Sequence, residues 1–235
     1  MSASRHCFTS RYGGVSEGIY KSFNLRINSD DSPENLRENY RRLEAQMKCS
    51  RYVLANQKHT DIVLEVDGSF AKRDLFDKID YVADGLITRE PELMLVVFSA
   101  DCVPILLEGD GVVAAVHAGW RGTAQCIVQK AVRSMNCEPR SIRAWIGPAI
   151  GGCCYQVGDE VRAAMLQSMG KCAESAFVED RVDLKRLNGL QLEACGVERI
   201  EVSGECTFCK PQKYWSHRYT NGQRGTQAAA IVLEA

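Results

Sequence analysis

The chain has almost no net charge and very little histidine. Its 29 lysines and arginines are balanced by 30 aspartates and glutamates, and four of its 235 residues are histidine. This balance gives no electrostatic case for a nucleic acid or an anionic membrane as partner. No apolar run approaches the length that a membrane-spanning helix needs. The first residues also lack the apolar segment of a secretory signal, so we expect a cytoplasmic protein.

Internal repeats, low-complexity segments and linkers rich in proline, glycine or serine are absent from the sequence as well. Apolar residues make up 45% of the composition and charged residues 25%, which is ordinary for a soluble globular enzyme with a sizeable core. We therefore expect one domain over residues 1–235. Neither the composition nor the charge indicates an oligomeric state.

Cysteine is abundant, with eleven residues, an odd number. In a chain without an export signal such thiols are mostly reduced, so we expect no disulfide framework. Cys206 and Cys209 form a CxxC motif that stands alone, because no second pair has the spacing of a structural zinc site. Cys153 and Cys154 are adjacent and follow two glycines, and we interpret them as residues that pack a loop.

Apolar patterns predict an interleaved series of helices and strands. Ser32 and Pro33 are a typical helix start, and apolar residues at three- and four-residue spacing continue that helix to Met47. A hairpin is expected from residues 214–219 and 226–233. The other elements are helices over about 123–135, 159–169 and 183–195, and strands over about 52–55, 62–66, 93–99, 103–107, 112–116 and 142–146. Frequent hairpin signals favour an α/β fold of layered mixed sheets with packed helices over a doubly wound parallel sheet.

Three side chains that can bind a metal accompany these strands. Cys102 and His117 come from two apolar runs that flank a tight turn, and His59 lies in or beside a loop upstream. Two imidazoles and one thiolate make a plausible zinc set with one coordination position left open, which is the catalytic arrangement. Asp101 lies between strong apolar runs, so it needs a hydrogen-bonding or electrostatic reason to be there.

The segment after His117 reads Ala-Gly-Trp-Arg-Gly-Thr and precedes a predicted helix. Its glycines allow close approach of the backbone, and Arg121 offers a fork of donors for a phosphate or a carboxylate. The alternative is that Arg121 only stacks on Trp120.

Several long motifs resemble one known family. They are Ser99-Ala-Asp-Cys-Val-Pro-Ile-Leu, Ala115-Val-His-Ala-Gly-Trp-Arg-Gly, Ile146-Gly-Pro-Ala-Ile-Gly, Cys154-Tyr-Gln-Val-Gly and Trp215-Ser-His-Arg. With them the chain resembles, nearly end to end, the YfiH/YlmD family, also called the multicopper polyphenol oxidase (laccase-domain) or peptidoglycan editing factor family.

The resemblance implies a YfiH-like layered α/β fold related to a group of cysteine-hydrolase toxins. It also implies a zinc site at His59, Cys102 and His117, and purine nucleoside phosphorolysis, with adenosine deamination and methylthioadenosine cleavage as related activities. The substrates would then be a purine nucleoside and phosphate. Other members have been described as copper-dependent phenol oxidases or as hydrolases of peptidoglycan precursors.

Two departures from the family pattern bear on the substrate. The usual Glu-Asn-Arg of the first helix is here Glu38-Asn39-Tyr40, and Arg41 is a candidate replacement for the missing arginine. The usual Ser-His-Arg-Arg is Ser216-His217-Arg218-Tyr219, in which His217 and Arg218 are kept as candidate substrate contacts.

We expect a zinc-dependent enzyme on purine nucleosides, and deamination is the more robust expectation because it needs no phosphate site. Asp101 is the carboxylate nearest the ligands in sequence, as a catalytic or an orienting group. Copper is the alternative metal, since thiolate and imidazole accept it readily, but four histidines are too few for a conventional trinuclear centre. A metal-free amide hydrolase, with Cys102 as nucleophile and His117 as base, is the third possibility.

Overall fold

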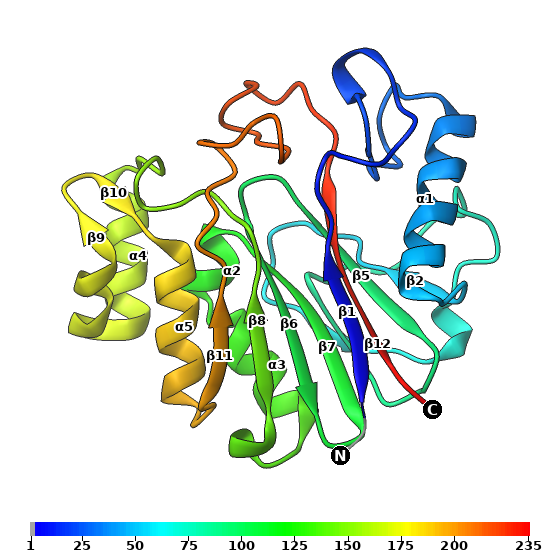
Figure 1. The fold of residues 1–235 in the computed structure, drawn as a ribbon. Helices are drawn as coiled ribbons and strands as arrows, with labels where there is room; N and C mark the ends of the chain where they lie inside the picture. The colour runs from blue at the N-terminus through cyan, green and yellow to red at the C-terminus, as the bar shows by residue number, and fades with distance from the viewer. Residues whose placement is uncertain (1–2) are drawn as a thin grey trace.

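Two mixed sheets packed face to face form the centre of the computed structural model, which describes residues 3–235 (Figure 1). The strands of the first sheet, in spatial order, are β1 (Ser4–Phe8), β12 (Gln227–Leu233), β5 (Met94–Ser99) and β2 (Tyr52–Leu54). The strands of the second sheet are β11 (Arg199–Val202), β8 (Arg143–Ile146), β6 (Val103–Gly109), β7 (Val112–Ala118), β4 (Gly85–Thr88) and β3 (Val63–Glu65). The pairs β2–β5, β3–β4 and β8–β11 are parallel and the other pairs are antiparallel.

Helices cover the outer faces of both sheets, so the molecule has four layers. Helix α1 (Pro33–Met47) packs on the first sheet. On the side of the second sheet lie α2 (Trp120–Ala124), α3 (Ile127–Met135), α4 (Asp159–Met169) and α5 (Leu184–Ala194). The short elements are the pair β9 (Phe177–Val178) and β10 (Arg181–Val182), and 3-10 turns at Gly18–Tyr20, Gly68–Phe70, Pro139–Ser141 and Gly170–Ala176.

Alternate residues of the central strands enter different cores, which explains their unbroken apolar runs. In β6, Ile105 and Leu107 face the helices, whereas Leu106 lies between the sheets. In β5, Val96 faces α1 and Val97 lies between the sheets. The expected layered mixed α/β fold is therefore confirmed.

Helix α1 begins and ends as its sequence predicts. The Ser32 side chain accepts a hydrogen bond from the backbone N–H of Asn35, and Pro33 occupies the first turn. Leu36 and Leu43 are among its buried residues. After Met47 the chain leaves the helix through a left-handed residue, Lys48.

Two expected elements differ from the structure. The helix expected over 123–135 begins at Trp120 and is broken at Cys126, whose positive φ of 57° separates α2 from α3. The expected hairpin partner of β12, residues 214–219, is a series of turns instead. Both edges of β12 are already paired, with β1 and with β5, so no edge remains for a hairpin partner.

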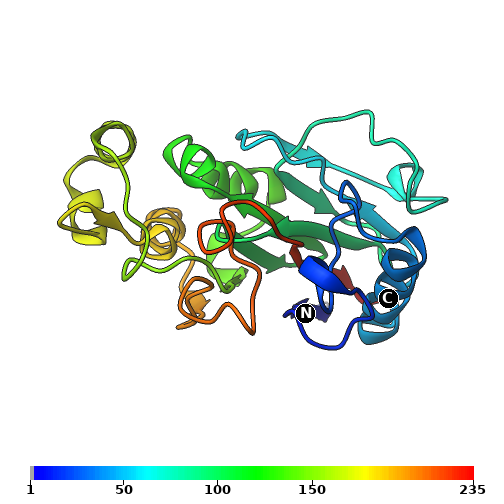
Figure 2. The ribbon, with the colours of Figure 1, turned by 90° about the horizontal axis from the view of Figure 1, so that it is seen from above.

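The register of the second sheet brings the start of β6 and the end of β7 to one edge, where Pro104 pairs with His117. The segment that joins β11 to β12, orange to red in the figures, lies over this edge (Figures 1 and 2). None of the helices in residues 3–235 combines the length and the apolar character that a membrane crossing requires.

Candidate metal centre

Three elements bring the predicted ligands together at this sheet edge. Cys102 directly precedes β6, His117 is the penultimate residue of β7, and His59 lies in the loop between β2 and β3. The sulfur and the imidazole nitrogens that these residues offer lie within 4.8 Å of one another. Cys102 Sγ is 3.7 Å from His59 Nε2.

A fully buried carboxylate, Asp84, holds both histidines in place. Its Oδ1 accepts a hydrogen bond of 2.8 Å from His117 Nδ1, which leaves Nε2 of that ring free to bind a metal. The same carboxylate accepts hydrogen bonds from the backbone N–H groups of Lys58, His59 and Thr60 and from the Thr60 hydroxyl. These bonds fix the loop in which His59 adopts a positive φ of 59°.

The charges of the centre favour a thiolate. Burial acts to raise the pKa of Cys102, but the neighbouring His117 and His59 outweigh burial and lower that pKa to about 6. Burial acts to lower the pKa of His117, but Cys102 and Asp84 raise it to about 9. For Asp84 burial again opposes ionisation, and hydrogen bonds from His117 and Thr60 lower its pKa to about 2. A thiolate and imidazoles of fixed orientation suit Zn²⁺ or copper.

A glycine keeps space beside the ligands. A Cβ atom at Gly119 would lie 2.8 Å from His59 Cδ2 and 3.2 Å from Cys102 Sγ. Any larger residue there would push the histidine away. The donor set and this space fit a single metal ion with one coordination position open.

Two cavities of about 280 and 260 Å³ meet at the centre and share His59, Ala100, Cys102 and Arg224. The walls of the first combine apolar and amide side chains with Arg26 and Lys58, and those of the second combine aromatic side chains with Arg121 and Arg218. The additional residues of the first include Ile27, Asn28, Asn56, Gln57, Lys58, Ile79 and Phe98. The additional residues of the second include Asp101, Trp120, Arg121, Tyr155, His217 and Arg218. Both cavities therefore offer cations to a ligand, and the first adds apolar and amide surface.

The residues named as substrate contacts fall into two groups. Arg121, His217 and Arg218 line the second cavity. The Arg121 guanidinium also lies 4.2 Å from the ring centroid of Trp120, so it stacks on its neighbour while lining the cavity. Arg41 is exposed on α1, pairs with Glu38 and lines neither cavity, so the structure does not bring it to the centre.

Asp101 supports the segment above the centre and has no free oxygen. Its Oδ1 accepts a hydrogen bond of 2.6 Å from the Thr207 hydroxyl, and its Oδ2 accepts one of 2.7 Å from the backbone N–H of Arg218. Its backbone φ is 93°, and its carbonyl accepts a hydrogen bond from the N–H of Ile150. These contacts suit an orienting residue.

Asp84 and Arg224 are site residues that the sequence interpretation missed. Asp84 directly precedes the apolar strand β4, and an acidic residue in that position is a signal that could have found it. Arg224 lines both cavities, and its Nε is buried without a hydrogen-bond partner. No pattern around Arg224 in the sequence distinguishes it from a surface residue.

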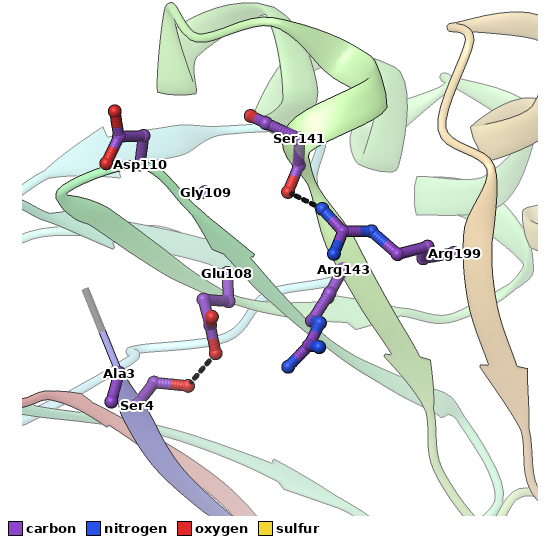
Figure 3. Close-up of a pocket in the computed structure, with 8 residues that line it drawn as sticks. All are labelled: Ala3, Ser4, Glu108, Gly109, Asp110, Ser141, Arg143 and Arg199. Carbon is purple, nitrogen blue, oxygen red and sulfur yellow. Dashed lines mark hydrogen bonds between the residues drawn. The ribbon is translucent and has the colours of Figure 1, made fainter. Parts of the chain in front are cut away.

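A further cavity, of about 250 Å³, lies at the opposite end of the second sheet (Figure 3). It is lined by Glu108 from the end of β6, Asp110 from the β6–β7 turn, and Arg143 and Arg199 from β8 and β11. The Glu108 carboxylate accepts a hydrogen bond from Ser4, and Arg199 donates one to the Ser141 carbonyl. These contacts give the cavity no cluster of free catalytic groups.

The fold and the centre define a class of layered mixed α/β protein with a His–Cys–His candidate metal site at a sheet edge. The chain belongs to the family described as multi-copper polyphenol oxidoreductase laccase, whose family model matches residues 5–234. This finding confirms the family that the motifs indicate.

Named relatives and solved structures cover nearly the whole chain. A purine nucleoside phosphorylase from Pseudomonas aeruginosa is 36% identical over 238 residues, which cover 98% of this chain and 93% of that protein. The Escherichia coli protein named purine nucleoside phosphorylase YfiH is 34% identical over 220 residues, covering 90% and 87%. The structure of YfiH from Bacillus licheniformis matches with a TM-score of 0.93 and 32% identity, covering 98% and 93% of the two chains. YlmD from Geobacillus stearothermophilus matches with a TM-score of 0.91 and 33% identity, covering 99% and 92%.

Proposed function

We propose that the chain is a zinc-dependent purine nucleoside phosphorylase, the activity for which its relatives are named. The observation that carries this proposal is that two adjoining cavities share His59 and Cys102, with His117 lining the first of them. A nucleoside and a phosphate need two such neighbouring sites, because the phosphate oxygen must reach the ribose carbon that carries the base.

The first cavity suits the base. Phe98, Ile79 and Ile27 offer apolar surface for a flat ring, and Asn28 offers an amide group, while the Asn56 amide donates to the Tyr81 carbonyl. The Gln57 side-chain amide donates a hydrogen bond to the Phe98 carbonyl and accepts one from the Phe98 N–H, which fixes this wall of the cavity.

The second cavity suits phosphate. Arg121, Arg218 and Arg224 line it, and arginine binds phosphate through paired N–H donors. Tyr40, which occupies the position of the family arginine, is buried, and its hydroxyl donates to the Leu25 carbonyl. The phosphate site must therefore consist of other cations, and Arg224 with its unpartnered Nε is the strongest of them.

The ligand residues would hold Zn²⁺ through the Cys102 thiolate and one nitrogen of each imidazole. When bound, the ion supplies a Lewis acid with one free position, which polarises a substrate oxygen in phosphorolysis and acidifies a water in deamination. Asp84 keeps His117 in the required tautomer, and Gly119 leaves space for the ligand. The arginines hold the attacking phosphate in position while the purine leaves with a proton.

Deamination of adenosine ranks below phosphorolysis at this site. Proton transfer in a deaminase needs a carboxylate beside the metal that is free to exchange a proton. Asp84 accepts hydrogen bonds from His117 and the His59 loop, and both oxygens of Asp101 are engaged by Thr207 and Arg218. We keep deamination as a secondary activity of the same centre.

Copper-dependent oxidation of phenols ranks lower still. The described residues place two of the four histidines at the centre. Of the others, His6 stacks on Trp145 with ring centroids 4.0 Å apart, and His217 lies in the second cavity. A multicopper relay needs several imidazole-rich sites, which these positions do not provide.

The test is incubation of the purified protein with inosine and with adenosine, with and without phosphate, followed by chromatography. We expect hypoxanthine or adenine together with ribose 1-phosphate, and only when phosphate is present. Cys102→Ala should abolish the products, whereas Cys172→Ser, at an exposed cysteine away from the centre, should not. Conversion of adenosine to inosine without phosphate would favour deamination. Oxidation of a phenol by copper-loaded protein, with no nucleoside product, would favour the oxidase.

One observation favours a second candidate, an amide hydrolase. The contacts among Cys102, His117 and Asp84 match those of the nucleophile, the base and the orienting acid in a cysteine hydrolase. The pKa of the Cys102 thiol is also lowered. A hydrolase of this kind works without metal. Activity on an amide substrate that persists after chelation, together with an acylated Cys102 found by mass spectrometry, would establish it.

A further inference from the structure

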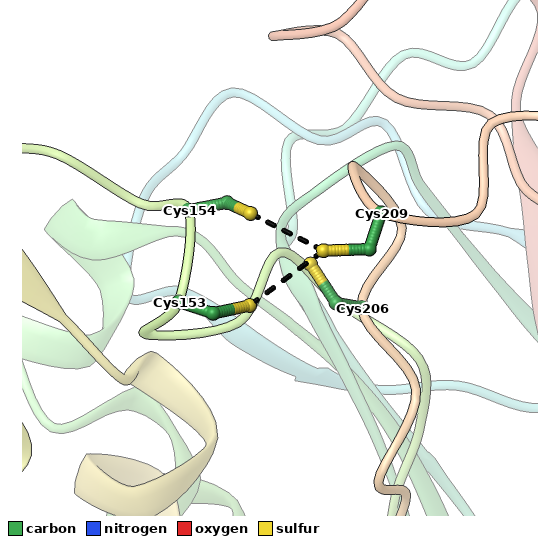
Figure 4. A group of neighbouring side chains, drawn as sticks. All are labelled: Cys153, Cys154, Cys206 and Cys209. Atoms are coloured by element: carbon green, nitrogen blue, oxygen red, sulfur yellow. Dashed lines mark hydrogen bonds between the residues drawn. The ribbon is translucent and has the colours of Figure 1, made fainter.

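Four cysteines from two distant segments converge in the second half of the chain (Figure 4). Cys153 and Cys154 lie in the loop after β8, and Cys206 and Cys209 lie in the turns after β11. Their four sulfur atoms lie within 4.8 Å of one another. The expectation that the CxxC motif stands alone is therefore wrong, because Cys153 and Cys154 provide the second pair.

We propose that these four cysteines bind a second Zn²⁺ ion in a structural site, separate from the centre at His59, Cys102 and His117. Zinc bonds to sulfur at about 2.3 Å, so a tetrahedral site places its sulfurs roughly 3.8 Å apart. Cys209 Sγ is 3.8 Å from Cys153 Sγ and 3.3 Å from Cys154 Sγ. Four protein ligands leave no open position, which is the arrangement of a structural site.

The backbone around the cluster is built to bring the two segments together. Ala149 and Cys206 form a bridge of parallel-strand type, and the N–H of Thr207 donates to the Ala149 carbonyl. The backbone N–H of Gly151 donates to Cys206 Sγ at 3.2 Å, a contact that stabilises a thiolate. A Cβ at Gly151 would lie 3.2 Å from Cys153 Sγ, so glycine leaves the space that the cluster needs.

Metal binding accounts for the cluster better than a disulfide does. A disulfide joins two sulfurs at about 2.05 Å, far closer than the 3.3 and 3.8 Å from Cys209 Sγ to its neighbours, and two such bonds would have to form to use all four thiols. Forming it would also require an oxidant. One ion satisfies all four sulfurs at once, and Arg181 donates a hydrogen bond to the Cys153 carbonyl, which holds this loop in place.

The site would act on the proposed substrate cavity through one short chain of contacts. Thr207 lies inside the CxxC motif, and its hydroxyl donates to Asp101, the residue directly before Cys102. Asp101 in turn accepts from the N–H of Arg218. A zinc ion on the four cysteines would thus fasten the loop that carries His217 and Arg218 over the centre.

The metal content of the protein tests the proposal directly. The protein is purified from medium supplemented with Zn²⁺, without chelators and under a reducing agent, and metal per chain is measured by elemental mass spectrometry. We expect two zinc ions for the unaltered chain and for the control Cys172→Ser. Cys206→Ser/Cys209→Ser should bind one. Cys102→Ala should also retain one, which separates this site from the proposed catalytic centre.

Cobalt substitution identifies the ligands without relying on a folded cysteine variant at the cluster. Metal-free Cys102→Ala protein titrated with Co²⁺ should give the intense thiolate-to-cobalt charge-transfer absorption of a four-sulfur site at one equivalent. Absence of this absorption together with no retained zinc in Cys102→Ala would overturn the proposal. So would a cross-link between any two of the four cysteines, detected by alkylation and peptide mass mapping of the protein as purified. Failure of the nucleoside assay alone would leave the proposal standing.

Discussion

The Asp84 carboxylate and the His117 imidazole form a buried pair, with Nδ1 of the ring 2.8 Å from Oδ1 of the acid. The backbones of the two residues are also joined, because the N–H of His117 donates to the Asp84 carbonyl. Since the same carboxylate binds the backbone at His59, one acid positions two of the three candidate ligands. Its replacement should therefore affect metal binding although Asp84 is not itself one of the three candidate ligands.

Asp84→Asn should weaken zinc binding by about 10- to 100-fold, the usual effect of removing a partner that orients a ligand. The amide cannot accept every hydrogen bond that the carboxylate accepts, so stability should also fall, by about 1–3 kcal/mol. Chelator competition measures the affinity, and thermal unfolding of the metal-free proteins measures the stability. Asp61→Asn, in the same loop as His59 but paired with Lys130 rather than with a candidate ligand, is the control and should leave zinc affinity unchanged. An unaltered affinity in Asp84→Asn would show that the pair is not needed to orient His117.

Zinc affinity should rise with pH through the neutral range. With the pKa of Cys102 at about 6 and that of His117 at about 9, the metal-free centre at pH 7 holds a thiolate and a protonated imidazole. Zinc must displace the His117 proton, so its apparent affinity should increase about tenfold per pH unit between pH 6 and 9. Below pH 6 the increase should be steeper, because Cys102 must then lose a proton as well.

Chelator competition at a series of pH values checks this slope once the protonation of the chelator is accounted for. Cys102→Ala is the informative comparison. Because the thiolate is part of what raises the pKa of His117, its removal should flatten the slope between pH 7 and 9. An affinity of the unaltered protein that is constant from pH 6 to 8 would contradict the assigned protonation states.

The local patterns that predict helices and strands also predict much of the centre. Cys102 and His117 border two apolar runs joined by a tight turn, and an antiparallel pair places such residues at one edge. The cap at Ser32 and the apolar spacing likewise predict α1. These features depend on residues that are close together in the sequence, so the sequence of one chain is enough to predict them.

Features that depend on distant segments were not predictable in the same way. Asp84 reaches His117 because β4 pairs with β7. Arg224 reaches the centre because its loop returns there from the C-terminal region. The cysteine cluster depends on the bridge between Ala149 and Cys206. The hairpin expected for 214–219 failed for the same reason, since the partners of β12 are β1 and β5. That residues 1–235 form a single domain stays a prediction.

Gly119→Ala should lower metal content while the fold persists. The added Cβ would lie 2.8 Å from His59 Cδ2, closer than real Cβ contacts, so the exposed His59 side chain must shift away from the other ligands. We therefore expect loss of zinc and of activity, with far-ultraviolet circular dichroism unchanged. Gly204→Ala is the matched control, because nothing lies within 4 Å of the Cβ that it adds. Full zinc occupancy in Gly119→Ala would show that the loop accommodates the methyl group.

Arg224→Lys should raise the KM for phosphate and leave the KM for the nucleoside nearly unchanged. Lysine keeps the positive charge but loses the fork that binds two phosphate oxygens, and the Nε of Arg224 is buried with no protein partner. Loss of a hydrogen bond to a charged group is equivalent to about 1.5–3 kcal/mol, or roughly 10- to 100-fold in the KM for phosphate.

Two further substitutions locate the phosphate by comparison with Arg224→Lys. Arg121→Lys should have a smaller effect, because the Arg121 guanidinium already stacks on Trp120. Arg41→Lys, at an exposed arginine paired with Glu38, should change neither KM. Steady-state rates with phosphate and inosine varied in turn, expressed per folded molecule, distinguish these cases. If Arg224→Lys raises the KM for inosine instead, this arginine binds the nucleoside, and phosphate must be held by Arg121 and Arg218 in the second cavity.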